Sequence, residues 1–408
     1  MKNEPLYLTA REAAAELSIS PASLYAYVSR GLIRSEPSPD SRSHRYRAED
    51  VRALKARRAP SGDSRAFNFD ADFPLLDSAV STFTEDGPLY RGVPCLALSQ
   101  SASLEHAATL LWDAAATDPF ADDNLPILSP AMSEIFRAAA GAPAVDRAVA
   151  ILALAGDADP RAFNRVPEGR AATGARILRL VVAAMTDGKP SAVPVHRHVA
   201  QRWTQHGSGK NPHAEDLLRR ALVLLADHEL NASTFTVRCA ASTGISLYDA
   251  VIAGLVAVKG PRHGGAGARA AQLVAQLRQA DAGAIVRERV ALGEGLPGFG
   301  HGIYGKGDPR ARELLAVLAW AGADATLVRD VPAKVLEATG EAPNIDYALA
   351  VLTTTLGMPA NSELPLFAIA RTVGWIAHAI EQMQTGGLIR PRARYIGPAP
   401  GRMAALKA

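Results

Sequence analysis

Apolar residues recur at helical spacing through most of the chain after about residue 100. Within the stretch 214–228, intervals of one, three and four residues predict a one-sided helical stripe made of Leu217, Leu218, Ala221, Leu224 and Leu225. Further stretches with helical patterns are 103–116, 174–186, 246–258, 267–280 and 366–383. Strand signals are few, and the best candidate is "GPLYRGVPCLAL" at 87–98. The pattern therefore predicts a mainly α-helical protein.

The first 60 residues are organised differently, as short helices separated by polar turns. Thr9 and Glu12 have the spacing of a capping box, which begins a helix over "AREAAAELSI". Pro21 suits the first position of a second helix, which ends at Gly31. A polar loop with a basic tip, a return strand and a third helix from Ala48 follow. We therefore predict a helix-turn-helix domain over 1–60 and a linker rich in Gly, Ser and charge over 61–68.

This order of elements resembles the MerR-type winged helix over residues 7–58. The resemblance implies a second helix that enters the major groove and presents Ser23, Tyr25, Tyr27 and Arg30. It also implies a wing that offers phosphates Arg42, His44, Arg45 and Arg47. Phosphate contacts give affinity but little sequence information. DNA is therefore one candidate partner. Alternatively, the tyrosines belong to the core and the arginines form a solvated face, or the segment is a protein interaction module.

Composition and charge narrow the class of protein. Of the 408 residues, 48% are apolar and 21% are charged, as in a globular protein long enough for more than one domain. The net charge is +3, and residues 1–60 hold 11 Lys and Arg against 7 Asp and Glu, which is +4. Cys95 and Cys239 have no metal or redox spacing, so we expect a reduced, cytoplasmic setting. No apolar run reaches membrane length, so no membrane partner is expected.

Four stretches place reactive side chains at chain breaks. "KGPRHGGAG" (259–267) sets His263 between a Gly-Pro break and two glycines, where a ring can point into a cleft. "LLADHELNASTF" sets His228 at the end of an apolar helix, and "LPGFGHGIYGKGDPRARELL" sets His301 nine residues before Arg310. "APNIDYALAVL" sets Asp346 at a helix start. Alone, each has a structural explanation: a capping or core histidine, a turn, or an acid favoured by the helix dipole.

Together and in this order, these stretches resemble the citrate synthase family, over about 69–408 and most strongly over 215–400. "DGPLYRG" (86–92), "LFAIARTVGWIAHAIEQ" (366–382) and "GGLIRPRARYIGP" (386–398) match family segments as well. The resemblance implies a mainly α fold with a large domain, 69–263 and 350–408, and a small domain, 264–349. It also implies a homodimer and a site between the domains that closes to exclude water.

The family joins a CoA thioester to a 2-oxo acid, and the resemblance assigns roles by residue. Asp346 matches the base that removes a weakly acidic proton from the thioester methyl group. His263 matches the donor to the enolate oxygen, and its glycines are expected to leave room for that carbonyl. His301 matches the group that polarises the oxo acid carbonyl. Such acid–base steps contribute about 10²–10⁴-fold each. No metal or redox cofactor is implied.

The second substrate, oxaloacetate, is a dianion, and planar bidentate arginine suits its carboxylates. The family's carboxylate-binding arginines match Arg310, Arg371 and Arg390, the last donated across the dimer interface. His228 matches a position that hydrogen-bonds the oxo acid. One departure from the family concerns CoA binding. The family often has a basic residue that contacts the CoA phosphates, but this chain has Gly305 at that position, followed by Lys306. Residue 302 is also glycine, where bulkier side chains are common.

Acetyl-CoA, giving citrate, is the leading acyl donor. Propionyl-CoA, giving 2-methylcitrate, stays open because one methylene is worth only about 1–3 kcal/mol of discrimination. A DNA-binding regulator that senses a metabolite is the competing class, and a dimerisation or docking role for the N-terminal segment is a third. His196 and His198 are expected at the surface rather than as a metal pair, because residues two apart diverge on a helix.

Overall fold

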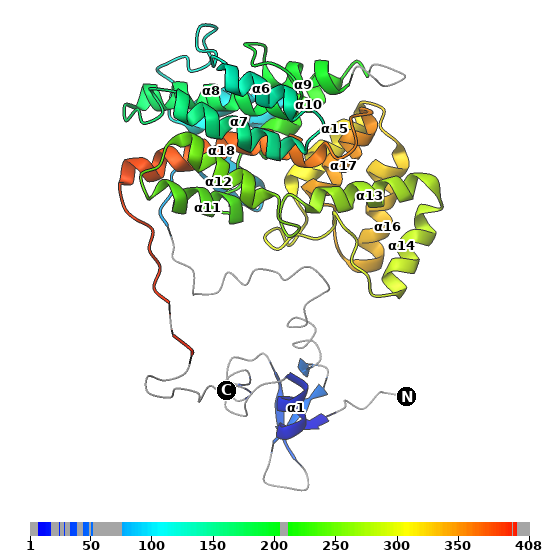
Figure 1. The fold of residues 1–408 in the computed structure, drawn as a ribbon. Coiled ribbons are helices and arrows are strands. Elements are labelled where there is room, and N and C mark those ends of the chain that lie inside the picture. Colours follow the sequence, from blue (N-terminus) through cyan, green and yellow to red (C-terminus); the bar gives the residue numbers. More distant parts are fainter. Residues whose placement is uncertain are drawn as a thin grey trace, which may run out of the picture. The chain divides into compact units, whose positions relative to one another are not determined.

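The structure is a computed structural model that describes residues 7–17, 24, 28, 33–38, 44–48, 50–51, 76–204, 211–393 and 395–397. The chain divides into two compact units, residues 1–68 and 69–408. Figure 1 shows the elements of each unit in sequence colours. The predicted subdivision of 69–408 into a large and a small domain stays a prediction.

The first unit contains a three-stranded antiparallel sheet in the order β1-β3-β2. Its elements are β1 (Tyr7–Thr9), α1 (Ala10–Leu17), β2 (Ser35–Pro37) and β3 (His44–Arg47). The predicted capping box is confirmed, because Thr9 Oγ1 accepts from the Glu12 amide at 3.3 Å and Glu12 Oε2 accepts from the Thr9 amide at 2.8 Å. A small core fixes the sheet against the helical residues and consists of Ala13, Ala14, Leu17, Leu24, Ile33, Tyr46 and Val51.

A helix-turn-helix fold is not shown by these elements. Leu24 and Val28 are helical, but Ser23, Tyr25, Tyr27, Arg30 and Arg42, which were expected to face DNA, lie outside the described residues. The wing residues that are described lie on β3: His44 is exposed, while Arg45 and Arg47 approach Glu36 at 3.5 and 3.2 Å.

The second unit opens with a small sheet and continues as helices. Its strands are β4 (Ser81–Thr84), β5 (Gly87–Tyr90) and β6 (Val93–Pro94), paired in that order. The predicted strand segment is therefore confirmed over 87–90 and 93–94, with a turn at 91–92, but Cys95–Leu98 already belongs to a helix. The helices before residue 230 are α4 (Cys95–Ser101), α5 (Leu104–Leu111), α6 (Pro130–Ala138), α7 (Ala144–Ala158), α8 (Pro167–Met185), α9 (Val195–Trp203) and α10 (Ala214–Leu225).

The later helices carry most of the chemistry-bearing turns between them. They are α11 (Ala232–Ala241), α12 (Leu247–Val258), α13 (Ala266–Gln279), α14 (Ala282–Ala291), α15 (Pro309–Trp320), a π-helical turn η1 (Thr326–Asp330), α16 (Val331–Thr339), α17 (Ile345–Thr355) and α18 (Glu363–Thr385). Side-chain caps begin several of them, for example Asn231 on α11 and Ser246 on α12. The mainly α-helical prediction is confirmed, although the stretch 103–116 ends its helix early, at Leu111.

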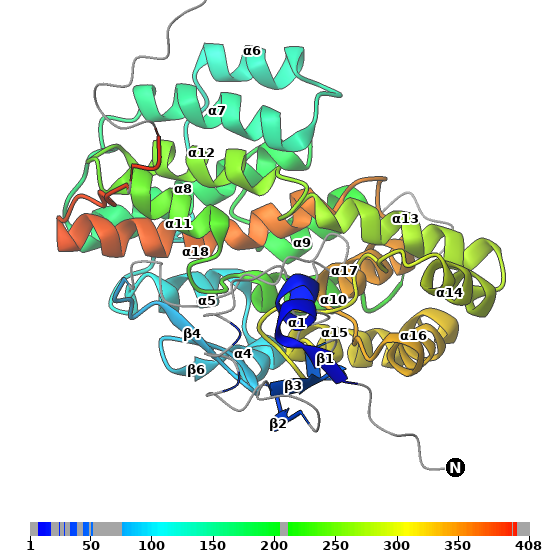
Figure 2. The same ribbon diagram turned by 90° about the horizontal axis from the view of Figure 1, so that it is seen from below.

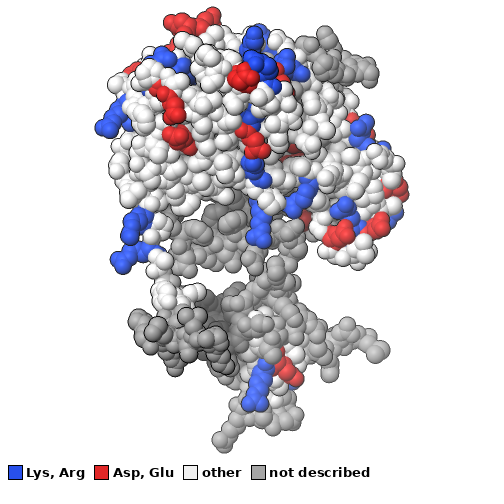
Figure 3. Space-filling view, in the orientation of Figure 1, with Lys and Arg blue, Asp and Glu red and all other residues white. Residues whose placement is uncertain are grey.

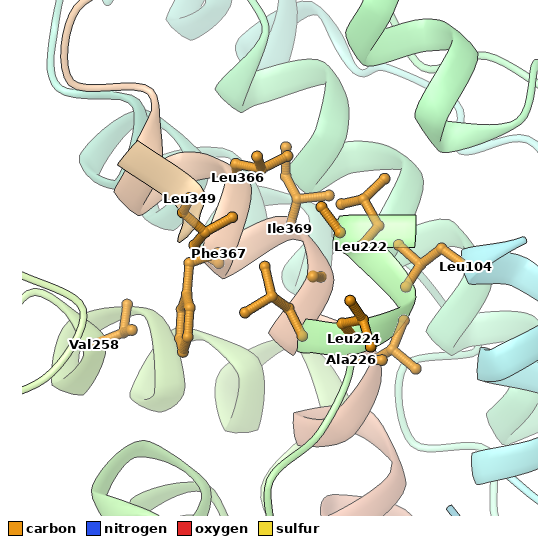
Figure 4. Close-up of a cluster of buried hydrophobic side chains, with 14 of the residues drawn as sticks. Leu104, Leu222, Leu224, Ala226, Val258, Leu349, Leu366, Phe367 and Ile369 are labelled. Carbon is orange, nitrogen blue, oxygen red and sulfur yellow. The ribbon is translucent and has the colours of Figure 1, made fainter. Parts of the chain in front are cut away.

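Helix α18 is the centre of this unit and is buried over most of its length. Figure 2 shows it crossing the unit, with α8, α11 and α12 on one side and α5 on the other, and all four contact it. Leu366, Phe367 and Ile369 of α18 pack with Leu222 and Leu224 of α10 in the cluster of Figure 4. A 23-residue helix buried on all sides is consistent with its nearly continuous apolar sequence.

Charged side chains are spread over the outside of the second unit. On the face shown in Figure 3, acidic and basic residues are interspersed. None of the described helices combines the length and hydrophobicity that crossing a bilayer requires.

The prediction that His196 and His198 lie at the surface is wrong, because both are buried on α9. His198 Nε2 lies 3.1 Å from Thr186 Oγ1. The two side chains diverge, but other helices cover α9 on two sides, so both are buried.

Gly254 allows α12 to approach α18 closely. A Cβ atom there would lie 2.7 Å from a Trp375 ring carbon and 2.8 Å from Val237 Cγ2. We expect Gly254→Ala to lower the free energy of unfolding by about 1–3 kcal/mol, measured by urea denaturation, because the core must move apart. The matched control is Gly283→Ala in α14, where the nearest atoms to the new methyl group are the side-chain ends of Arg287, Lys334 and Asp281, at 3.1–3.3 Å. Equal stability of the two variants would contradict the close packing.

Candidate active site

Most of the predicted site residues lie at the ends of helices of the second unit or in the turns between them. His228 follows α10, His263 lies between α12 and α13, and His301 lies in the turn before α15. Arg310 and Asp346 lie in the first turns of α15 and α17, and Arg371 lies inside α18. Helix ends expose backbone groups and free side chains, so this placement suits binding and catalysis.

His228 is held in a group of aromatic rings. Its Nε2 atom lies 2.9 Å from the Tyr304 hydroxyl, and its ring stacks on Phe83 with centroids 5.6 Å apart and 20° between the planes. The His301 ring meets it edge-on at 5.7 Å. Burial, followed by the charges of Arg310 and Arg371, holds the pKa of His228 well below its usual value. The structure therefore brings His228 and His301 together, with His228 neutral.

His301 presents a defined tautomer. Its Nδ1 atom accepts from the Ile303 amide at 3.1 Å, and burial lowers its pKa to about 4. A neutral imidazole has one N–H group, so the proton is on Nε2. His301 is thus a neutral hydrogen-bond donor, a form that can polarise a carbonyl without carrying a charge.

His263 is anchored through a shared hydroxyl group. Its Nε2 atom lies 2.7 Å from Ser233 Oγ, and the Trp375 indole N–H donates to that same oxygen at 3.1 Å. The ring meets Phe367 edge-on at 5.9 Å. Burial, and then the charge of Arg371, lowers the pKa of His263 to about 4. His263 is therefore also neutral, and its ring is fixed by helices α11 and α18.

The glycines beside His263 act differently from the prediction. A Cβ atom on Gly264 would lie 2.6 Å from Leu364 Cδ1 and 2.7 Å from the Val258 carbonyl oxygen, and one on Gly265 would lie 3.0 Å from the Gly260 carbonyl oxygen. The glycines allow close backbone approach, as expected, but the space beside them is filled by the protein itself. Their role here is to close the turn tightly around the histidine rather than to leave room for substrate.

The two buried arginines have different partners. Arg310 forms a two-point ion pair with Asp308, with Nε–Oδ1 at 3.0 Å and Nη2–Oδ2 at 2.8 Å. Burial opposes the charge of Arg310, but Asp308 outweighs it and raises the pKa. Arg371 donates from Nε to the Leu225 carbonyl at 3.0 Å and lies over the Phe367 ring. Burial lowers the pKa of Arg371 to about 10, so it stays charged at neutral pH.

Asp346 is a carboxylate held at a helix start. Asn344 caps α17 by accepting from the Asp346 and Tyr347 amides at 3.0 and 3.4 Å. Burial raises the pKa of Asp346 to about 6, although the nearby charge of Arg310 opposes this. A carboxylate with a raised pKa is a stronger base than an exposed one and is still ionised at neutral pH. Asp346 therefore fits the chemistry of proton removal.

Arg390 stands apart from the other six residues. It lies exposed in the segment after α18, which Figure 1 shows in red running away from the helices. Within the described part of the chain, no hydrogen bond or ion pair joins it to the other predicted site residues. Its predicted role across a dimer interface stays a prediction.

Sequence reasoning missed three groups that hold the site. Tyr304 and Asp308 lie inside the His301–Arg310 motif, so their position was a signal that could have been used. Phe83 had no such signal, because it reaches His228 from β4, far upstream in the sequence. A cavity of about 220 Å³ lies elsewhere, among Glu105, Arg179 and His198, and contains none of the site residues. Across the described ranges, no cluster of three His, Cys, Asp or Glu side chains is placed to hold a metal ion.

Comparison with known proteins identifies the family of the second unit. The family model "Citrate synthase, C-terminal domain" matches residues 71–392. This chain belongs to the citrate synthase family. It is similar to a protein named citrate synthase 2 from Bacillus subtilis strain 168, with 33% identity over 217 residues, which is 48% of this chain and 55% of that protein. The chain thus spans about half the length of this curated relative.

Two other likenesses extend further along the chain. A 2-methylcitrate synthase from Mycobacterium tuberculosis is 28% identical over 389 residues, covering 86% of this chain and 96% of that protein. The crystal structure of citrate synthase from Thermotoga maritima MSB8 superposes with a TM-score of 0.65 and 25% identity, covering 81% of this chain and 96% of that one. The citrate synthase fold of the second unit, which the sequence predicted, is therefore confirmed.

The raised pKa of Asp346 predicts a pH-dependent cost in stability. An Asp whose pKa rises from 3.8 to about 6 on folding destabilises the fold increasingly as the pH rises from about 4 to 6, and fully above that. We expect Asp346→Asn to raise the free energy of unfolding by about 2–3 kcal/mol at pH 8, with the gain shrinking toward pH 4. Urea denaturation of both proteins at each pH measures this. A difference that is independent of pH would contradict the raised pKa.

Proposed function

We propose that the protein condenses acetyl-CoA with oxaloacetate to give citrate and free CoA. Asp346 removes a proton from the thioester methyl group, and His263 donates to the enolate oxygen that develops. His301 donates from Nε2 to the oxo acid carbonyl as the new carbon–carbon bond forms there. Water then hydrolyses the citryl thioester and releases CoA. Each of the three roles needs a group in the protonation state described above.

One observation carries the proposal: two neutral imidazoles and a carboxylate with a raised pKa occur in a unit that also buries two arginine charges. A carboxylate near two cations normally has a lowered pKa, so burial must outweigh them at Asp346. Neutral histidines donate one hydrogen bond each and add no further charge. Such preorganised donors stabilise developing negative charge more strongly than water does.

The buried arginines fit the carboxylates of a dianionic oxo acid. Arg310 keeps its Asp308 partner. Within the described part of the chain Arg371 donates one hydrogen bond, to a neutral carbonyl, which leaves guanidinium N–H groups for substrate. We propose that the active unit is a homodimer in which Arg390 of the partner subunit completes the set. The exposed position of Arg390 outside its own helical bundle supports this.

Propionyl-CoA, giving 2-methylcitrate, is the second candidate acyl donor. The likeness to a 2-methylcitrate synthase along 96% of that protein favours it. At Gly305 this chain lacks the basic residue with which the family often contacts CoA phosphates, and Lys306 is the next residue in the sequence. The Lys306 Nζ atom pairs with Glu85 at 2.8 Å on an exposed surface. That pair must open if Lys306 is to meet a CoA phosphate.

The activity is tested by CoA thiol release with oxaloacetate, using acetyl-CoA and propionyl-CoA in parallel. We expect release with at least one donor, and a loss of about 10²–10⁴-fold in Asp346→Asn. The rate should fall about tenfold per pH unit below about pH 6, where Asp346 takes up its proton. The ratio of the two rates names the donor.

The same assay has a clear contrary outcome. No release with either donor from a folded protein would refute the synthase proposal. It would favour a regulator in which the second unit binds a metabolite without turning it over. Calorimetry with oxaloacetate separates a site that binds this metabolite without turnover from one that does not bind it. Arg371→Lys is the control, in which we expect weaker binding.

We also propose that the first unit, over residues 7–58, binds duplex DNA. The β2–β3 ribbon supports this by carrying exposed His44 together with Arg45 and Arg47. Their ion pairs with Glu36 are partly exposed, so exchange for phosphate is cheap. Binding through phosphates weakens steeply with salt.

A fluorescence titration with duplex DNA at several salt concentrations measures this. We expect the double variant Arg45→Ala/Arg47→Ala to reduce both the affinity and the salt slope. The matched control is Arg137→Ala/Arg161→Ala in the second unit, which removes the same charge. Equal binding by both variants, or no binding by the wild type, would contradict DNA binding through this ribbon and favour a docking or dimerisation module. Deletion of residues 1–60 would then test dimerisation through a change in the oligomeric state.

A further inference from the structure

Tyr304 is a buried tyrosine whose hydroxyl group lies within hydrogen-bond distance of His228, a residue predicted to bind the substrate. It is 6% exposed, and its oxygen lies 2.9 Å from His228 Nε2. We propose that Tyr304 is a positioning residue: its hydroxyl donates to His228 Nε2 and so fixes the His228 proton on Nδ1, from which it is donated to the oxo acid. This inference rests on the proposed function, because it concerns how His228 meets that substrate.

The direction of the hydrogen bond follows from the acceptors available. A buried hydroxyl group needs an acceptor for its proton, and leaving it without one costs free energy. Among the described residues, His228 Nε2 is the acceptor within hydrogen-bond distance of the Tyr304 oxygen. The phenol therefore donates and Nε2 accepts. A neutral imidazole that accepts at one nitrogen carries its proton at the other.

The tautomer matters because the substrate offers only acceptors. Carbonyl and carboxylate oxygens accept hydrogen bonds, so His228 must present an N–H group to bind them. Without the Tyr304 hydroxyl, either nitrogen can carry the proton. No hydrogen bond within the described chain occupies His228 Nδ1, so the proton placed there remains available for the substrate.

The ring of His228 is also fixed in orientation. Phe83 stacks on one of its faces, while Tyr304 and His301 meet it at interplanar angles of 66° and 70°. Tyr304 in turn lies 4.7 Å from the His301 ring, and the Arg310 guanidinium lies 5.9 Å from the Tyr304 centroid. One phenol thus contacts two predicted histidines and lies near a predicted arginine, so it connects the groups that would hold the oxo acid.

The first test compares Tyr304→Phe with the wild type in steady-state kinetics. We expect the KM for oxaloacetate to rise about tenfold, the KM for the acyl-CoA to change less than twofold, and kcat to fall less than threefold. The matched control is Tyr248→Phe, which also loses a buried tyrosine hydroxyl bond, at 2.9 Å to Asp159, but lies outside the site. It should leave both KM values unchanged. An unchanged or lower KM for oxaloacetate in Tyr304→Phe would overturn the proposal, the lower value indicating a phenol that obstructs substrate.

The second test does not depend on activity. The ¹⁵N spectrum of histidine-labelled protein shows which ring nitrogen carries the proton, and His228→Gln assigns the signal by its loss. We expect an Nδ1–H signature for His228 in the wild type and a shift toward Nε2–H in Tyr304→Phe. An Nε2–H signature in the wild type would refute the assignment even if the enzyme is active. If the protein proves inactive on both thioesters, this spectrum still decides the role of Tyr304.

Discussion

Burial of two guanidinium groups is the constraint on which the site depends. Taking an arginine charge out of water costs several kcal/mol unless partners offset it. Arg310 meets this cost with Asp308, which caps α15 and also accepts from the Ile345 amide at 3.1 Å, so one carboxylate joins the starts of two helices. Arg371 donates to the Leu225 carbonyl, and the nearby charge of the buried Asp227 carboxylate opposes the lowering of its pKa by burial.

The two arginine charges also affect the protonation states of the groups around them. Both arginine charges disfavour protonation of His228, and that of Arg371 does so for His263, which adds to the effect of burial. Asp227 is another buried carboxylate in this region: burial alone would raise its pKa, but His378 and Arg371 together keep it lowered. The protein thus lowers the pKa of one buried carboxylate, Asp227, and raises that of another, Asp346. Environment rather than residue type separates the two.

Sequence patterns predicted most of the helices and the chain breaks at which the candidate site residues lie, because both depend on local information. The apolar stripe of 214–228 and the Gly-Pro break before His263 are visible without a structure. The contacts of the site are not local: Phe83 reaches His228 from far upstream in the sequence, and Trp375 reaches Ser233 across 142 residues. Burial of His196 and His198 also depends on which helices cover α9, which the spacing of two residues does not reveal. The glycines at 264 and 265 are visible in the sequence. Whether open space or other protein atoms lie beside a glycine depends on the tertiary structure.

The hairpin of β4 and β5 has a consequence for how the chain can be divided. It supplies Phe83 to His228, and Ser81 hydrogen-bonds the Asp227 carboxylate beside it. The Tyr90 hydroxyl reaches the Val223 carbonyl at 3.0 Å near the end of α10. The boundary between the two units falls before this hairpin, at residues 68 and 69. A division of the chain between the two units therefore leaves this hairpin with the helices that it serves, whereas a shorter fragment that begins at α4 would keep every helix of the second unit and lose the strand residues that hold His228 and Asp227.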